Sequence, residues 1–260
     1  MILEALAALT RGRVAEEKKK IPAGEMRRMA ESLPVTGAFS FEAALRAPGL
    51  SFICEVKKAS PSKGLIAADF PYQQIAQEYE QAGASAISVL TEPYRFLGSN
   101  QYMQEIAQKV NIPVLRKDFT VDPYMIDQAK VLGASAVLLI CAILDDGAIR
   151  EYMAQARELG LSALVEAHDE KEVERAMAAG ATIIGVNNRD LRTFQVDVNN
   201  SIRLRAMVPP ELVFVSESGI RGPEDPRVLY ENGTDAVLIG ETLMRSPDKK
   251  AVLDQLRRGK

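Results

Sequence analysis

Residues 135–188 read SAVLLICAILDDGAIREYMAQARELGLSALVEAHDEKEVERAMAAGATIIGVNN and repeat one pattern. Short apolar runs, such as SAVLLI (135–140) and LSALVE (161–166), alternate with stretches such as IREYMAQARELG (149–160), in which apolar residues recur every three or four positions before a glycine. Strands that are apolar on both faces are typical of parallel sheets, and the stretches between them are typical of amphipathic helices. This segment therefore predicts strand–helix units of a parallel sheet.

The same pattern extends in both directions from this segment. Candidate strands occur at residues 51–57, 85–90, 112–117, 135–140, 161–166, 182–188, 212–218 and 235–240. Eight such units after residue 50 favour a closed (β/α)8 barrel, the TIM barrel of the α/β class, over an open doubly wound sheet. Residues 1–50 carry helical patterns and no strand, so we expect an N-terminal helical extension. Residues 51–260 then form the eight units, and 1–260 make a single domain.

The composition is that of a soluble globular protein. The chain has 260 residues, 47% hydrophobic and 26% charged, with a net charge of −3 and basic residues spread along the sequence. Because clustered basic residues mark phosphate-backbone binders, we expect no nucleic-acid partner. No run approaches the roughly 18 apolar residues of a membrane span, and the first residues lack a basic leader. We therefore expect a cytoplasmic protein with no membrane partner.

The cysteines and the single histidine argue against metal and disulfide chemistry. Cys54 and Cys141 lie in apolar runs, where a free thiol behaves as a small hydrophobe. His168 precedes Asp169, a candidate helix N-cap, so we expect a capping or surface role for it and not catalysis. One histidine and two isolated cysteines give no metal-ligand spacing, and we expect no metal site.

Polar residues collect at the carboxyl ends of the predicted strands, where barrels build their active sites. Because side chains alternate across a strand, Glu55 and Lys57 should both point into the barrel mouth. The same alternation directs further polar side chains to that volume: Lys117, Glu166, Asn187 and Glu217. Acids and bases that converge in a restricted mouth are what proton-transfer chemistry needs.

An alternative interpretation is that these residues are ordinary solvated strand ends. It fits Lys58, Asp118 and Glu92 best. It fits the whole set less well, because five strands direct polar groups at one volume.

Two stretches suggest a phosphate site. Ser218 and Gly219 after the seventh strand, and Gly240 after the eighth, lie where barrels commonly hold a phosphate on backbone N–H groups. Residues 60–64, Ser-Pro-Ser-Lys-Gly, could fold over it as a flexible lid. A glycine after a strand is by itself usually only a tight turn, so Gly240 alone would not indicate a phosphate.

Seven motifs in chain order carry a resemblance to a known family. They are EVKKASPSKGLI (55–66), SVLTEPYRFLGS (88–99), PVLRKDFTVDPY (113–124), LVEAHDE (164–170), IGVNNRDLRTF (184–194), VSESGI (215–220) and VLIGETLMR (237–245). Through nearly its whole length the chain resembles the indole-3-glycerol phosphate synthases. The resemblance implies a barrel that converts 1-(2-carboxyphenylamino)-1-deoxyribulose 5-phosphate to indole-3-glycerol phosphate. Carbon dioxide and water are released, and no cofactor is needed.

The resemblance also implies roles for the residues at the barrel mouth. Lys117 matches the general acid that protonates the oxygen leaving as water, and Glu166 matches the general base. Lys57 matches the lysine close to the substrate carboxylate, and Glu55 its partner in the lysine network. A lysine that acts as an acid must give up its proton readily, so we expect burial and the nearby Lys57 to favour proton loss from Lys117.

The remaining matches concern substrate binding. Asn187 and Arg189 match residues that hydrogen-bond the reacting region and the anthranilate side, and Glu217 matches a carboxylate of the catalytic site. The other residues assigned to the substrate are Ser218, Gly219, Gly240 and Ser60 at the phosphate, and Phe119. Glu241 stands where some members carry Ser, which leaves backbone N–H groups to contact the phosphate there.

Two other functions stay open. One is another phosphate-binding barrel enzyme, such as a phosphoribosyl-intermediate isomerase, although those usually pair a Cys or Asp base with an Asp acid. The other is an inactive barrel with a binding role, although Lys57, Lys117, Glu166 and Asn187 are all present. For partners we expect a small phosphorylated substrate, and a monomer or weak homo-oligomer.

Overall fold

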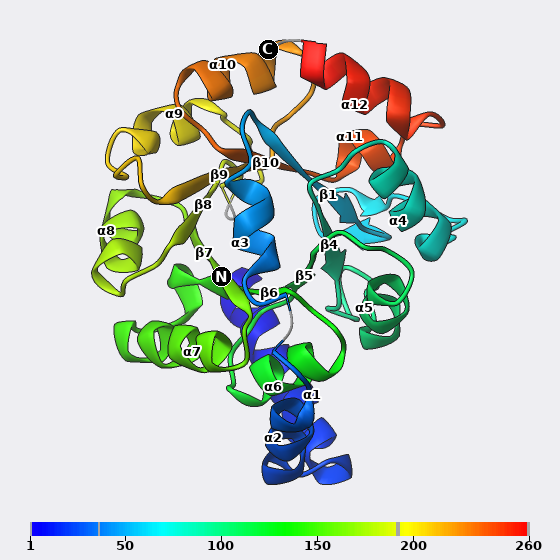
Figure 1. The fold of residues 1–260 in the computed structure, drawn as a ribbon, viewed down its shortest axis with the longest axis vertical. Helices are drawn as coiled ribbons and strands as arrows, with labels where there is room; N and C mark the ends of the chain where they lie inside the picture. Colours follow the sequence, from blue (N-terminus) through cyan, green and yellow to red (C-terminus); the bar gives the residue numbers. More distant parts are fainter. Residues whose placement is uncertain (1, 36, 191–192, 259–260) are drawn as a thin grey trace.

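In a computed structural model, which describes residues 2–35, 37–190 and 193–258, the chain forms a closed parallel barrel ringed by helices (Figure 1). The barrel strands are β1 (Ser51–Val56), β4 (Ala86–Leu90), β5 (Val114–Lys117), β6 (Ala136–Ile140), β7 (Ser162–Ala167), β8 (Ile183–Asn187), β9 (Val213–Glu217) and β10 (Ala236–Ile239). They pair in this order, and β10 closes the ring by pairing with β1. The (β/α)8 barrel is confirmed.

Helices lie outside the strands and connect them (Figure 1). They are α4 (Tyr72–Gln81), α5 (Asn100–Ala107), α6 (Tyr124–Val131), α7 (Asp146–Glu158), α8 (Glu170–Ala178), α9 (Asn199–Arg205), α10 (Glu224–Glu231), α11 (Glu241–Met244) and α12 (Lys249–Arg258), with a 3-10 turn at Cys141–Ile143. In the described part of the chain, none of the helices combines the length and the hydropathy that crossing a bilayer requires.

Side-chain alternation sorts the barrel strands into two cores. Inside the barrel, Ile53 of β1 shares a buried cluster with Leu164 of β7 and Val215 of β9. Cys54 and Val56 of β1 belong instead to the larger cluster between strands and helices. The predicted inward and outward faces are confirmed, and both cysteines are buried free thiols as expected.

The N-terminal extension consists of α1 (Ile2–Lys20), α2 (Ala23–Ser32) and α3 (Ser40–Leu45), which confirms its helical character. The short α3 lies across the barrel in Figure 1, at the amino ends of the strands, where the backbone N–H of Glu42 donates to Ser162 Oγ (3.3 Å). Leu6 of α1 is buried in the same cluster as Phe119, close to the carboxyl ends. The extension therefore covers both ends of the barrel.

Candidate active site

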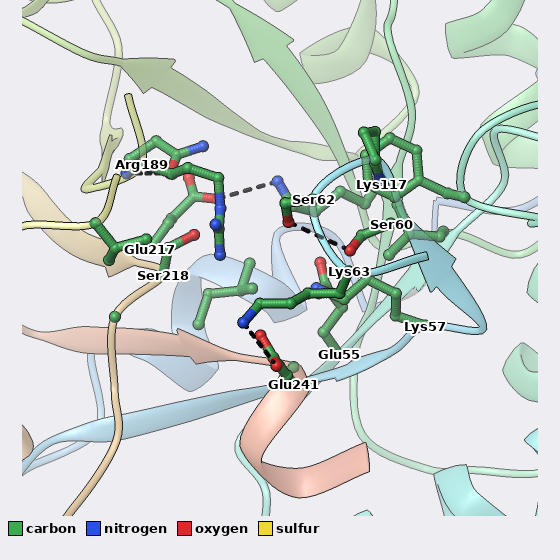
Figure 2. Close-up of a pocket in the computed structure, with 18 of the residues that line it drawn as sticks. Glu55, Lys57, Ser60, Ser62, Lys63, Lys117, Arg189, Glu217, Ser218 and Glu241 are labelled. Atoms are coloured by element: carbon green, nitrogen blue, oxygen red, sulfur yellow. Dashed lines mark hydrogen bonds and ion pairs between the residues drawn. The ribbon is translucent and has the colours of Figure 1, made fainter. Parts of the chain in front are cut away.

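A cavity of about 870 Å³ opens at the carboxyl ends of the barrel strands (Figure 2). Every residue that the sequence assigned to the site lines it: Glu55, Lys57, Ser60, Lys117, Phe119, Glu166, Asn187, Arg189, Glu217, Ser218, Gly219 and Gly240. These residues come from segments up to 185 positions apart, and the barrel brings them together at one rim. Their individual roles stay predictions.

Lys117 lies between two buried carboxylates. Its Nζ donates to Glu217 Oε2 (3.1 Å) and to Glu166 Oε2 (3.2 Å), and the side chain is only 14% exposed. Asn187 Nδ2 lies 3.4 Å from the other Glu166 oxygen. An ammonium group thus stands between two potential proton acceptors at the ends of β5, β7 and β9.

The pKa of Lys117 differs from the sequence-based expectation. Burial by itself lowers this pKa, but the carboxylates of Glu217, Glu166 and Glu55 outweigh burial and raise it above its ordinary value. The expectation that Lys117 loses its proton easily is therefore wrong. Lys57, the cation expected to favour proton loss from Lys117, is itself paired with Glu55.

The two carboxylates beside Lys117 have opposite pKa shifts. For Glu217, burial and the charges of Glu166 and Glu55 outweigh Lys117 and raise the pKa to about 7. For Glu166, burial is outweighed by Lys117, His168 and Asn187, and the pKa is lowered. When the pKa values of two carboxyls are pushed apart in this way, one carboxyl can hold a proton at a pH at which the other is ionised and can accept one.

Glycines leave space for these charged side chains. At Gly185 of β8, a Cβ atom would overlap Glu217 Oε1, which is buried without a hydrogen-bond partner among the described residues. At Gly240, a Cβ would overlap Glu55 Oε2 and lie 2.9 Å from Lys57 Nζ. The backbone therefore approaches the site closely at both positions, and a side chain at either one would displace the charged groups beside it.

The turn after β9 is held in an unusual conformation. Ser218 and Gly219 have φ values of 70° and 98°, in the left-handed region that costs a residue with a Cβ about 1–2 kcal/mol. Asn188 holds the turn, because its Nδ2 donates to the Ser218 carbonyl (3.0 Å) and to Ser216 Oγ (2.9 Å). The turn is thereby fixed at the rim of the cavity.

The segment expected to act as a lid forms a short antiparallel hairpin of β2 (Ala59–Ser60) and β3 (Gly64–Leu65). Figure 2 shows Lys63 reaching from it toward Glu241, with Nζ and Oε1 3.4 Å apart. Arg245, one turn further along α11, also contacts Glu241 (3.2 Å) and lines the cavity. The Glu241 carboxylate is therefore paired with two cations, Lys63 and Arg245.

Asp118 and Glu92 are not solvated strand ends, which corrects the interpretation that fitted them best. Asp118 is 3% exposed and accepts from Arg13 of α1 (2.7 Å) and Thr91 (2.5 Å). Glu92 is 1% exposed, and its carboxylate accepts backbone N–H groups of residues 94–96 at 2.7–2.9 Å. Both are structural, and Asp118 ties the N-terminal extension to the barrel.

His168 also differs from expectation. Asp169 is the N-cap of α8, as predicted, since its Oδ1 accepts from the Glu172 backbone N–H (2.9 Å). The imidazole, however, is only 17% exposed, and its Nε2 lies 3.4 Å from Glu166 Oε1. A surface role is therefore wrong. The strand alternation that placed Glu166 inward also assigns position 168 to that face, and this signal was available in the sequence.

Sequence reasoning missed the part of the cavity wall formed by α1. Ile2, Leu3 and Leu6 line it together with Phe96 from the loop after β4. No local pattern indicates that a helix which begins 49 residues before β1 reaches the carboxyl ends of the strands. These apolar side chains give the cavity one face suited to a planar apolar group.

The fold and the cavity together define a class of protein. The buried carboxylates and lysines suit proton transfer, while Arg189, Arg221, Arg245 and Lys63 line the same cavity and suit an anionic substrate. Within the part of the chain that the structure describes, no group of three or more His, Cys, Asp or Glu side chains could hold a metal ion. The class is a (β/α)8-barrel enzyme that performs acid–base chemistry on a small anionic molecule.

Comparison with known proteins identifies the family within this class. The family model described as indole-3-glycerol phosphate synthase matches residues 3–256. A protein of that name from Ruminiclostridium cellulolyticum is 56% identical over 257 residues, covering 99% of each chain, and one from Lacticaseibacillus paracasei is 51% identical over 253 residues, covering 97% of each. The chain belongs to the indole-3-glycerol phosphate synthase family, the decarboxylating lyases of tryptophan biosynthesis.

Solved structures with low sequence identity share the barrel. A 3-hexulose-6-phosphate synthase from Salmonella typhimurium superposes with a TM-score of 0.67 at 14% identity, covering 81% of this chain and 98% of that one. A thiamine phosphate pyrophosphorylase from Pyrococcus furiosus gives 0.60 at 15% identity, covering 81% and 94%. At such identities the likeness concerns the fold alone.

Proposed function

We propose that this chain forms indole-3-glycerol phosphate from 1-(2-carboxyphenylamino)-1-deoxyribulose 5-phosphate by general acid–base catalysis. The observation that carries the proposal is the position of Lys117 Nζ, within 3.2 Å of both Glu166 and Glu217 in a cavity lined by cations. The reaction forms a carbon–carbon bond, releases carbon dioxide and expels one oxygen as water. It therefore needs one group that gives a proton to the leaving oxygen and another that removes a proton from the ring.

Lys117 is the proposed acid and Glu166 the proposed base. The raised pKa of Lys117 keeps it protonated, as an acid must be at the start of the reaction. The lowered pKa of Glu166 keeps it ionised, as a base must be. Glu217, with a pKa of about 7, is proposed to take a proton near neutral pH. This removes one negative charge beside Lys117 and favours transfer of the lysine proton.

The remaining lining residues are proposed to bind the substrate. Lys57, held by Glu55, faces the substrate carboxylate, and Asn187 and Arg189 hydrogen-bond the anthranilate side and the reacting region. Phe119, in one buried cluster with Leu6, provides an apolar surface for the aromatic ring. The proposed phosphate contacts are Ser60, Ser218, Gly219 and Gly240, all of which line the same cavity.

An assay with purified substrates tests the proposal. With the carboxyphenylamino substrate, the native protein should form a fluorescent indole product that is absent without protein. A phosphoribosyl-intermediate isomerase substrate serves as the comparison. Turnover of the isomerase substrate alone would replace our assignment by that alternative, and inactivity on both would favour an inactive barrel with a binding role.

Gly240→Ala should impair this activity through Glu55 and Lys57. The added Cβ overlaps Glu55 Oε2, and because both side chains are flexible at their ends they can move aside at little cost in stability. Displacing a positioning group by about 1 Å can cost about 10²-fold in rate, and we expect a loss of about that size in kcat/KM. The matched control is Gly222→Ala, whose Cβ would meet nothing within 4 Å. Equal activity of the two variants would contradict the proposed role of the Glu55–Lys57 pair.

We further propose that residues 1–260 act as a single domain, as a monomer or weak homo-oligomer in the cytoplasm, with no cofactor and no nucleic-acid or membrane partner. Contacts of α1 and α3 with opposite ends of the barrel support one folding unit. The net charge of −3 supports the absence of a nucleic-acid partner.

A further inference from the structure

His168, the single histidine of the chain, joins the proposed base to a second carboxylate. Its Nε2 lies 3.4 Å from Glu166 Oε1, and its Nδ1 lies 3.0 Å from Glu172 Oε2 in the first turn of α8. The backbone of this residue is fixed as well, because its N–H donates to Glu172 Oε2 (2.9 Å) and its carbonyl accepts from Asn200 Nδ2 (3.0 Å). The imidazole is therefore held in one orientation between two carboxylates.

This orientation determines which protonation state fits. An ionised Glu172 can only accept a hydrogen bond from Nδ1–H, so a neutral ring would turn the lone pair of Nε2 toward the Glu166 carboxylate. Nε2 is buried and makes no hydrogen bond within the described residues, although Glu166 Oε1 faces it. An imidazolium would present an N–H there instead, and attract the carboxylate that a neutral ring repels.

The charged groups around His168 favour the imidazolium. Burial by itself lowers its pKa, but the hydrogen bond to Glu172 and the charges of Glu166, Glu172 and Glu217 raise it above the ordinary value. Glu166 lies on β7, Glu172 on α8 and Glu217 on β9, so the acids whose charges act on the ring come from three elements. Of the cations on α8, Arg175 pairs with Asp146 (2.6 Å).

We propose that His168 is a positioning residue that, as an imidazolium held by Glu172, keeps the Glu166 carboxylate ionised and fixed in direction for proton removal. The inference rests on the proposed function of Glu166 as general base. It adds a group that need not touch the substrate and that acts through Glu166. Loss of His168 should therefore shift the pH dependence of kcat, which Glu166 sets, and have less effect on the affinity for substrate.

Titration of the single imidazole by NMR tests the coupling without any need for activity. In the native protein the ring should titrate above the ordinary value of about 6.5. Glu166→Gln and Glu172→Gln should each lower this pKa by about one unit or more, since each removes an adjacent negative charge. Glu170→Gln is the matched control, because Glu170 is an exposed acid of the same helical turn and should leave the pKa unchanged.

The pH dependence of kcat tests the positioning role. In His168→Gln, Glu166 loses a cation that lowers its pKa, so the base is protonated at a higher pH and activity is lost earlier as pH falls. A shift of about one unit gives about a tenfold loss relative to native on the acid limb, with recovery at higher pH and KM within about twofold. A merely structural role would lower kcat by the same factor at every pH.

The two experiments separate the possible failures. The inference is overturned if the pKa of the imidazole is unchanged in both Glu166→Gln and Glu172→Gln. It is also overturned if a folded His168→Gln protein has the same acid limb in its pH profile of kcat as the native protein. If His168→Gln does not fold, Glu172→Gln should show the same movement of the acid limb, and an unmoved limb again overturns it. A native protein that forms no indole product refutes the proposed function, whereas the imidazole titration still decides the coupling.

Discussion

Lys117→Ala is expected to lower kcat for indole-3-glycerol phosphate formation by about 10²–10⁴-fold, the usual contribution of a positioned general acid. The variant lacks the ammonium group that lies 3.1 Å from Glu217 and 3.2 Å from Glu166. No other lysine or histidine is placed between these two carboxylates in the described part of the chain. The measurement is kcat by indole fluorescence at saturating substrate.

Two further variants separate the acid role from a structural one. Removal of Lys117 leaves buried carboxylates without their cation, which can destabilise the fold by itself. Lys117→Arg retains a cation near Glu166 and Glu217, but a guanidinium does not release its proton in proteins, so this variant should fold and still be nearly inactive. The exposed Lys109→Ala is the matched control for loss of a lysine. Native-like turnover in Lys117→Arg would rule out Lys117 as the acid.

Much of this site was predictable because strands have a simple period. Alternation of side chains across each strand predicts which side chains point into the barrel, among them Glu55, Lys117, Glu166 and Glu217. A closed parallel barrel then brings the carboxyl ends of all its strands to one rim. Glu217, for example, shares its strand face with Val215, which is buried inside the barrel. Neither inference requires knowledge of contacts between distant residues.

Two of the errors concern partners that are distant in sequence. The local sequence favours a solvated strand end for Asp118, because its partner Arg13 lies 105 positions earlier, on a helix whose location local periodicity does not give. The pKa of Lys117 depends on carboxylates 49 and 100 positions away, at distances that only the folded barrel defines. The error for His168 has another cause, because its partners Glu166 and Glu172 lie only two and four positions away. The neighbouring N-cap Asp169 suggests a surface position, whereas strand alternation from Glu166 predicts the inward one.

Glu166→Gln should bind the substrate almost normally and turn it over about 10²–10⁴-fold more slowly. The amide has nearly the size of the carboxylate, and its oxygen can still accept a hydrogen bond from Lys117 Nζ. It cannot take up a proton near neutral pH, so a base is lost without loss of shape. A 10³-fold effect corresponds to about 4 kcal/mol of transition-state stabilisation.

Slow turnover in Glu166→Gln allows substrate affinity to be measured directly, by equilibrium binding before appreciable product forms. We expect a Kd within about fivefold of the native KM, equivalent to about 1 kcal/mol, because the substituted group acts on a proton and not on a binding contact. Glu174→Gln, an exposed acid on α8, is the matched control and should be native in both quantities. Since kcat and Kd report different states, weak binding with native kcat at saturation would assign Glu166 to substrate positioning and leave the proton acceptor to Glu217.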